Sequence, residues 1–253
     1  MFSPDLARVV LERLALAGCV AAEEEADELL SAAADKETLE AWIARRERGE
    51  PLAWITRHID FGGLRLHVDP GVYVPRTQSE ELAVRAGDLL PARGRAADLC
   101  TGSGAVAAHL MKSTPGATVV ATDVDPRAAV CARRNGVVTL VADLDGGLST
   151  GAFDVVTAVT PYVPTSELRL LPVDVQRWEP RAALDGGTDG LDTVRRLVLG
   201  AARVLRHRGW LLAEIGGDED DAVEPLLAVA GFDRTAFWHD EDGDLRGLAA
   251  QVA

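Results

Sequence analysis

The chain has 253 residues, of which 47% are hydrophobic and 26% are charged, and its 40 acidic side chains outnumber its 26 Lys and Arg to give a formal net charge of −14. These values are typical of a folded globular protein and exclude a disordered one. The acidic balance argues against a protein that grips a DNA backbone, because such proteins carry a basic face.

Cysteine and histidine usage points away from a metal site. The three cysteines lie far apart without a C-x-x-C pair, and the five histidines do not fall at metal-ligand spacing. We therefore expect neither a bound metal nor a disulfide framework. The start of the chain lacks the pattern of a signal peptide, and no apolar run is long enough to span a membrane. We expect a cytoplasmic protein that does not enter a membrane.

The first fifty residues are predicted to be helical. A first helix should begin at Ser3-Pro4 and end at Gly18, and further helices should cover 23–33 and 36–48. This unit is either a small structural cap or a module that recognises a macromolecule.

A β-hairpin is predicted next, because residues 59–68 alternate in part around a Gly-Gly pair. From about residue 72 strands alternate with helices, which predicts an α/β fold with a parallel sheet covered on both faces. The expected strands are 96–100, 118–122, 138–142, 153–159, 210–215 and two more near 234–238 and 247–252, and the expected helices are 105–112, 126–135, 193–205 and 222–230.

A glycine-rich loop follows the first of these strands and opens a helix. Gly102 and Gly104 allow the backbone to approach a ligand closely. Asp123 ends the next strand, 21 residues after Gly102, where a carboxylate can accept hydrogen bonds from ribose hydroxyls. The pattern predicts a ligand that contains adenosine, at the carboxyl ends of the strands.

Two features favour S-adenosyl-L-methionine over a dinucleotide, although residues 102–107 also fit the G-x-G-x-x-A fingerprint. Asp98 precedes the loop, where its carboxylate can hold the cationic amino group of a methionine moiety but would repel a pyrophosphate. The chain also ends in a strand pair rather than a substrate domain. Asp143 follows a strand end, where it either accepts from the adenine amino group or caps a helix.

Six uncommon sequence blocks stand in order along most of the chain. They are residues 49–56 (GEPLAWIT), 61–64 (FGGL), 68–76 (VDPGVYVPR), 98–104 (DLCTGSG), 122–126 (TDVDP) and 179–191 (EPRAALDGGTDGL). Together they resemble the HemK/PrmC family of protein N5-glutamine methyltransferases.

The resemblance implies a class I S-adenosylmethionine-dependent methyltransferase, an α/β fold with a Rossmann-like seven-stranded sheet. It implies a helical domain over 1–52, a β-hairpin linker over 53–71 and a methyltransferase domain over 72–253. The family methylates the glutamine amide in the Gly-Gly-Gln loop of peptide-chain release factors. A release factor or another protein acceptor is therefore the expected partner.

The resemblance also assigns site residues. Cofactor contacts are expected from Asp98, Cys100, Thr101, Gly102, Ser103, Gly104, Asp123, Val124, Asp143 and Leu144. The acceptor is expected at Val159, Thr160, Pro161 and Tyr162. Arg76 and Glu80 are expected to shape the mouth of the site, or else to form an ordinary helix start with an ion pair. Glu179 lies in a matching block, where it either forms an internal salt bridge or contacts the substrate.

The chain departs from the family at its acceptor motif, where Asn-Pro-Pro-Tyr is replaced by Val159-Thr160-Pro161-Tyr162. In the family, the Asn side chain and a backbone carbonyl hydrogen-bond the target NH₂ and so orient a weak nucleophile. Val159 can neither donate nor accept. Cys100 also replaces a glycine of the cofactor loop and could crowd the methionine portion.

Three possibilities follow from the altered motif. Glutamine methylation persists, with the carbonyl and hydroxyl of Thr160 as partial substitutes for the lost amide. Alternatively, the scaffold methylates an amine or hydroxyl of a small molecule, for which the amide clamp is unnecessary. In the third, the protein binds the cofactor but transfers little or nothing.

Overall fold

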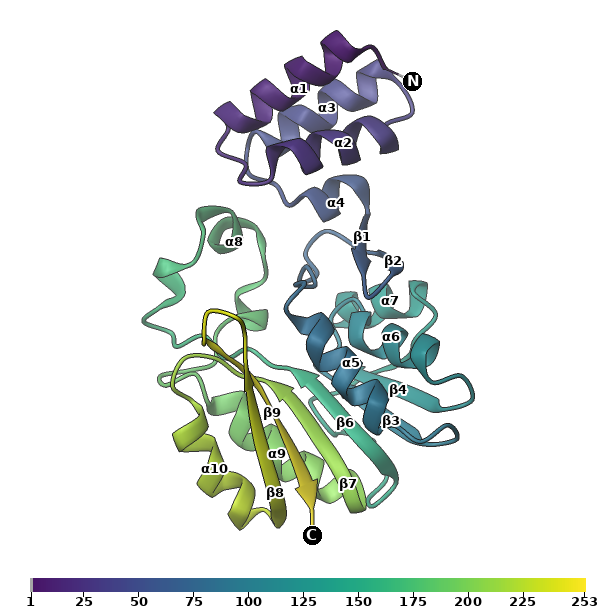
Figure 1. The fold of residues 1–253 in the computed structure, drawn as a ribbon, viewed down its shortest axis with the longest axis vertical. Helices are drawn as coiled ribbons and strands as arrows, with labels where there is room; N and C mark the ends of the chain where they lie inside the picture. Colours follow the sequence, from purple (N-terminus) through teal and green to yellow (C-terminus); the bar gives the residue numbers. More distant parts are fainter. Residues whose placement is uncertain (1) are drawn as a thin grey trace.

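The computed structural model describes residues 2–253 and shows a helical unit at one end of an elongated molecule (Figure 1). This unit consists of α1 (Pro4–Leu16), α2 (Ala22–Ala32) and α3 (Lys36–Arg46). The Ser3 hydroxyl accepts from the Leu6 N–H at the start of α1, as the sequence predicted, and Asp35 caps α3 in the same way. The third helix ends at Arg46 rather than at residue 48. The three helices share a core made of Val10, Leu14, Ala26, Leu29, Leu39 and Ile43.

A short helix and a β-hairpin connect this unit to the rest of the chain. They are α4 (Leu52–Thr56), β1 (His58–Phe61) and β2 (Leu64–His67). Gly62 and Gly63 both have positive φ, 55° and 68°, which a two-residue hairpin turn requires. The predicted hairpin is therefore confirmed, whereas α4 was not anticipated.

The sheet has seven strands in the order β5-β4-β3-β6-β7-β9-β8. They are β3 (Arg95–Leu99), β4 (Thr118–Asp123), β5 (Val138–Val141), β6 (Phe153–Val159), β7 (Leu205–Glu214), β8 (Phe232–His239) and β9 (Leu245–Val252). The expectation of a parallel sheet fails only at β9, which is antiparallel to both of its neighbours. A short turn joins β8 to β9, and only an antiparallel pair can be connected so briefly.

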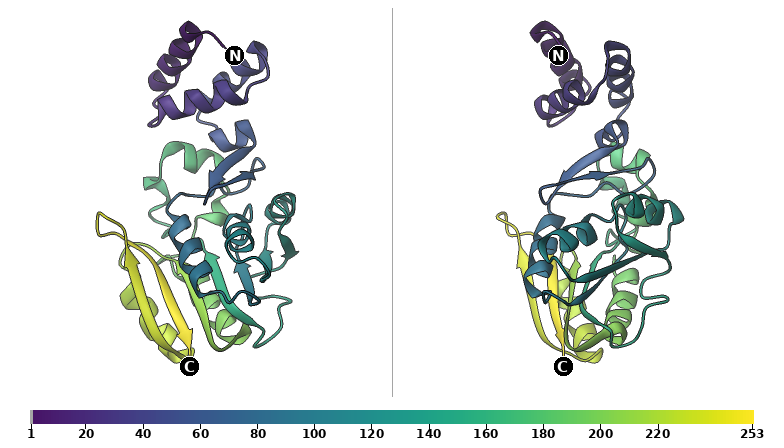
Figure 2. Two further views of the ribbon diagram at one scale, coloured as in Figure 1. Left: turned by 45° about the vertical axis from the view of Figure 1, so that its right-hand side comes forward. Right: turned by 90° about the vertical axis from the view of Figure 1, so that its right-hand side faces the viewer.

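Helices cover both faces of the sheet (Figure 2). On one face lie α5 (Ser79–Leu89), α6 (Ala105–Ser113) and α7 (Pro126–Arg134). On the other lie α9 (Asp192–Val204) and α10 (Asp220–Val229). Alanines dominate the first interface, which lets α6 approach the sheet closely. The two-faced covering that the sequence predicted is confirmed.

An insertion between β6 and α9 reaches back toward the helical unit (Figure 1). It contains η1 (Leu168–Leu170), α8 (Val173–Trp178) and η2 (Arg181–Ala183). A Cβ built on Gly49, just after α3, would lie 3.6 Å from Trp178 Nε1. The insertion therefore packs beside the end of the helical unit. No helix within residues 2–253 is both long and apolar enough to cross a membrane.

Candidate active site

A single large cavity of about 1190 Å³ opens at the carboxyl ends of the central strands. Its wall combines the glycine loop, the segment 159–163 after β6, the segment 71–79 before α5, the insertion and the turn between α1 and α2. Ligands of α/β folds bind at this edge of the sheet. The cavity therefore joins the predicted cofactor residues to the predicted acceptor residues.

The side-chain carboxylate of Asp123 holds the glycine loop through a backbone N–H group. Gly102 N–H donates to Asp123 Oδ2 at 2.8 Å, and the N–H of Asp125 donates to the other oxygen at 2.9 Å. Burial raises the pKa of the Asp123 carboxyl above its usual range. A Cβ on Gly102 would meet nothing within 4 Å, so this glycine leaves open space in the cavity wall. Gly104 faces the protein instead, because a Cβ there would lie 3.0 Å from the side chains of Ala132 and Val137.

Asp98 is a buried carboxyl beneath the loop, with 2% of its surface exposed. Thr101 Oγ1 donates to one of its oxygens at 2.5 Å and Thr157 Oγ1 to the other at 2.7 Å. Burial raises the pKa of Asp98 to about 6, and the two hydroxyls oppose that rise. A cation placed beside it would favour the ionised form. The site therefore suits the cationic group that the sequence suggested.

Other predicted cofactor residues also line the cavity. Cys100 adopts φ +56°, which is strained for a residue other than glycine. Burial raises the pKa of its thiol, so the sulfur stays neutral and is no nucleophile. Val124 is exposed and apolar, and Leu144 is buried. Asp143 lies at the cavity rim, where it forms an ion pair with Arg196 of α9.

On the acceptor side, Tyr162 is fixed by a buried glutamate. Tyr162 Oη donates to Glu214 Oε1 at 2.9 Å, and Ser79 Oγ donates to the other oxygen of Glu214 at 2.5 Å. Gln78 Nε2 also reaches Glu214 Oε1, at 3.1 Å. Burial, and then the nearby Glu214 carboxylate, raise the pKa of the Tyr162 phenol, so the hydroxyl remains a donor. The ring is thereby held in one orientation in the cavity wall.

Sequence reasoning missed Glu214, Ser79 and Gln78. Glu214 was detectable in part, because it ends an apolar strand at the edge where ligands bind. Nothing local indicated that α5 and β7 would meet there, since their contacting residues are about 135 positions apart.

The altered motif places an apolar side chain and a buried hydroxyl in this wall. Val159 is partly buried and lines the cavity beside Thr160, Pro161 and Tyr162. Thr160 is 2% exposed, and its hydroxyl has no hydrogen-bond partner among residues 2–253. Leaving such a group unpaired costs about 1–3 kcal/mol. The side chain of Thr160 therefore has an unused hydrogen-bonding group in the part of the wall where the sequence predicts the acceptor.

Arg76 and Glu80, expected together at the mouth, are separated by the start of α5. Arg76 lines the cavity and forms an ion pair with Glu179, whose Oε2 also accepts from the Val74 N–H at 3.3 Å. Glu80 does not line the cavity, and the adjacent Ser79 faces it instead. Glu179 thus makes the internal salt bridge that the sequence had left open.

Comparisons with known proteins agree with this arrangement. No protein-family profile matches the chain. It is 36% identical to the release factor glutamine methyltransferase of Geobacter sulfurreducens, over 75% of this chain and 69% of that protein. It is 41% identical to that of Moorella thermoacetica (75% and 70% covered) and 38% identical to that of Pseudomonas aeruginosa (86% and 81% covered).

Solved structures share the fold at low sequence identity. The hMettl16 catalytic domain superposes with a TM-score of 0.59 at 15% identity, covering 85% of this chain and 81% of that one. A ribosomal protein L11 methylase from Lactobacillus delbrueckii subsp. bulgaricus gives a TM-score of 0.52 at 20% identity, covering 74% and 84%. The fold is that of class I S-adenosylmethionine-dependent methyltransferases, as the sequence predicted. The identity to curated relatives over more than two thirds of their length shows that this chain belongs to the family of release factor glutamine methyltransferases.

Proposed function

We propose that the protein transfers a methyl group from S-adenosyl-L-methionine to the side-chain nitrogen of a glutamine in a peptide-chain release factor. The observation that carries this proposal is the continuity of one cavity from the glycine loop to the segment Val159–Tyr162. Family membership supplies the acceptor class. Three free cysteines in the described part of the chain accord with a reducing cytoplasm, where we place the reaction.

The residues at the glycine loop fit the cofactor. Asp98 would hold the amino group of the methionine moiety, and Asp123, already oriented by two backbone N–H groups, would accept from the ribose. Asp143 and Leu144 would flank the adenine on one side, and the exposed Val124 would lie against its other face. When bound, S-adenosyl-L-methionine would supply a methyl group on a sulfonium, which is already an activated leaving group.

The residues on the acceptor side would orient the acceptor amide and exclude water from it. An amide nitrogen is a weak nucleophile, so most of the acceleration must come from alignment and from exclusion of water. Tyr162, tied to Glu214, would pack on the planar amide. The backbone carbonyl of Thr160 would accept one N–H of the acceptor and so turn the nitrogen toward the methyl group.

A second candidate rests on one observation, the valine at position 159. An apolar side chain at the acceptor position suits a more nucleophilic amine or hydroxyl of a small molecule, which needs no amide clamp. This alternative keeps the same cofactor site.

Incubation with a release factor and S-adenosyl-L-methionine tests the proposal. We expect a mass gain of one methyl group on the Gly-Gly-Gln peptide, with a relative that carries the complete Asn-Pro-Pro-Tyr motif as positive control. If the protein binds the cofactor and the control is active but the peptide gains no mass, the glutamine acceptor is wrong. If the protein does not bind the cofactor, the methyltransferase function is wrong.

A further inference from the structure

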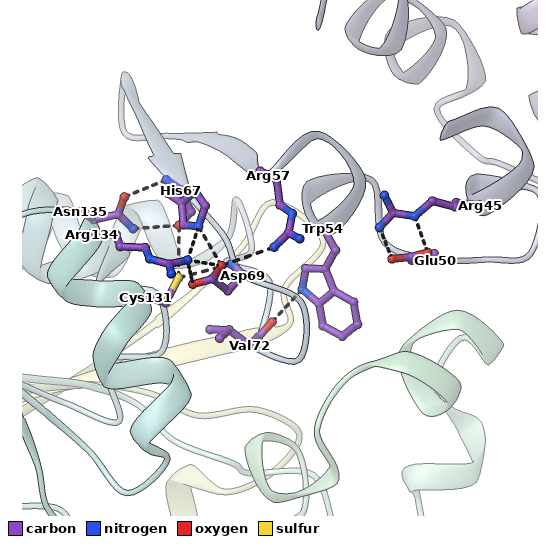
Figure 3. A network of polar contacts seen from close by, with 10 residues as sticks. All are labelled: Arg45, Glu50, Trp54, Arg57, His67, Asp69, Val72, Cys131, Arg134 and Asn135. Carbon is purple, nitrogen blue, oxygen red and sulfur yellow. Dashed lines mark hydrogen bonds and ion pairs between the residues drawn. The ribbon is translucent and has the colours of Figure 1, made fainter. Parts of the chain in front are cut away.

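Asn135, directly after α7, makes three strong hydrogen bonds with its side-chain amide. Its Oδ1 accepts from the His67 N–H at 2.7 Å, and its Nδ2 donates to the His67 carbonyl at 2.8 Å (Figure 3). The same Nδ2 donates to the carbonyl of Ser103 at 2.8 Å. One side chain therefore joins the last residue of the hairpin to the middle of the glycine loop.

The hairpin side of this junction is firmly built. Asn135 satisfies both backbone groups of His67, as a neighbouring strand would. Cys131, one turn earlier on α7, donates to the His67 carbonyl and accepts from the Asp69 N–H, both at 3.4 Å. Arg134 binds Asp69 as well (Figure 3). The end of α7 thus fixes the chain where it leaves β2 at His67, four residues before Gly71 of the cavity wall.

On the loop side, Asp123 binds the Gly102 N–H and Asp98 binds the Thr101 hydroxyl, and Asn135 adds an anchor at Ser103. Ser103 is 1% exposed, and its hydroxyl has no hydrogen-bond partner within residues 2–253. Its neighbour Gly104 packs against Ala132 and Val137, so the loop rests on the same end of α7. The bond from Asn135 therefore sets the position of the Ser103 carbonyl.

We propose that Asn135 is a positioning residue that couples the cofactor loop to the hairpin. The inference rests on the proposed function, because it takes the loop as the cofactor site. A ligand that orders the loop then also orders the hairpin, and by reciprocity an ordered hairpin strengthens ligand binding. Residues 71–73 of the cavity wall follow the hairpin, so a hairpin that is ordered also orders this part of the wall.

The test combines calorimetry with amide hydrogen exchange, using S-adenosylhomocysteine as the probe because it cannot transfer a methyl group. In the unaltered protein we expect the probe to slow exchange in residues 58–68 as well as in the loop. Asn135→Asp keeps the shape but loses the Nδ2 donor to the carbonyls of both Ser103 and His67. We expect it to bind the probe about tenfold more weakly, within the usual range of such couplings. Exchange in its hairpin should no longer respond to the probe.

Val130→Ala is the matched control. It shortens an exposed apolar side chain on α7, the helix that Asn135 follows, and Val130 does not line the cavity, so probe affinity and hairpin protection should stay unchanged. A role of Asn135 in stability alone would lower the melting temperature but leave the hairpin's response to the probe intact.

The possible outcomes separate the proposed function from the inference about Asn135. An unaltered protein that does not bind the probe overturns the proposed function and this inference with it. Binding without any change of exchange in the hairpin overturns the inference alone, whether or not the variant folds. The same holds if Asn135→Asp keeps both its affinity and its ligand-dependent protection.

Discussion

Val159 gives the acceptor position an apolar wall where the family pattern has an amide. The neighbouring Tyr162 is nevertheless fully supported by Glu214, and the Thr160 hydroxyl beside it is buried without a partner. For the acceptor that we propose, this wall therefore keeps its aromatic residue and lacks one hydrogen-bonding group. The effect of this loss can be tested by substituting a single residue.

Restoring the amide by Val159→Asn should raise methyl transfer to a release-factor glutamine. A positioned hydrogen bond to the acceptor NH₂ improves its alignment, and we expect kcat/KM to rise about tenfold to a hundredfold. Incorporation of labelled methyl into the Gly-Gly-Gln peptide measures this, with Val159→Leu as the apolar control. Equal rates in the asparagine and leucine variants would show that the substrate is not an amide.

Cys100→Gly should remove backbone strain from the cofactor loop. A non-glycine residue at φ +56° costs on the order of 1 kcal/mol, and glycine adopts this conformation freely. We expect a slightly higher melting temperature and tighter binding of S-adenosylhomocysteine by calorimetry. Cys131→Ala is the control at a buried cysteine whose φ is not positive, and it should lower the stability of the protein without tightening binding. Weaker binding by Cys100→Gly would refute the strain argument.

At the scale of elements, the Arg76–Glu179 pair is one of the polar links that tie the insertion 160–191 to the sheet domain. The Glu179 side chain is 2% exposed and that of Arg76 30%. Arg76 also lies over the Tyr73 ring, 4.9 Å from its centroid. This pair holds the base of the insertion next to the start of α5.

Arg76→Met should therefore destabilise the protein by about 2–4 kcal/mol, because it leaves a buried carboxylate without its cation. Chemical denaturation measures the loss. The double variant Arg76→Met with Glu179→Gln should recover part of it. Arg181→Met removes an exposed pair with Asp185 and should change stability by about 0.5 kcal/mol or less. Equal losses from both arginines would rule out a special role for the buried pair.

The helices and strands also show how much of the structure the local sequence predicts. Gly102 and Asp123 were predictable because a strand, a tight loop and a helix follow one another along the chain. Helices α4 and α8 were missed, since five and six residues are too few to show a helical period. Strand β7 begins at Leu205 rather than at residue 210, because pairing with Phe153 extends it across an irregular stretch. Contacts such as Ser79 with Glu214 depend on strand order, which no local pattern contains.

At the scale of the whole molecule, α4 lies between two separate hydrophobic cores. Ile55 of α4 packs into the core of α1–α3, whereas its neighbour Trp54 packs with Val68 and Val74 below. Trp54 Nε1 also donates to the Val72 carbonyl at 2.9 Å (Figure 3). The division at residue 52 stays a prediction, and these contacts make α4 a shared boundary.

Global stability should depend on pH through Glu219, which lies at the start of α10. Burial raises its pKa from 4.5 to about 7, although the Gly216 N–H donates to it. Because the folded pKa is the higher one, the folded state binds the extra proton. The contribution of Glu219 to the free energy of unfolding is fully present below about pH 4.5 and declines as the pH rises through about 7.

Glu219→Gln should remove this decline. Unfolding free energies measured at pH 5 and pH 8 should differ less in the variant than in the unaltered protein, and the variant should be the more stable at pH 8. Asp221→Asn, at an exposed position of the same helix, is the control and should behave like the unaltered protein. An unchanged pH profile in Glu219→Gln would place the titrating group elsewhere.

The direction of the antiparallel strand β9 determines where the carboxyl end of this chain lies. Its residue Gly247 pairs with Glu214, which binds Tyr162 of the cavity wall, whereas Gln251 pairs with Trp210 toward the other end of the strands. The carboxyl terminus is therefore delivered to the side remote from the helical unit (Figure 1). A surface tether or a reporter domain fused there should leave the entrance of the cavity open. That end is therefore suited to immobilising the protein in screens for acceptors.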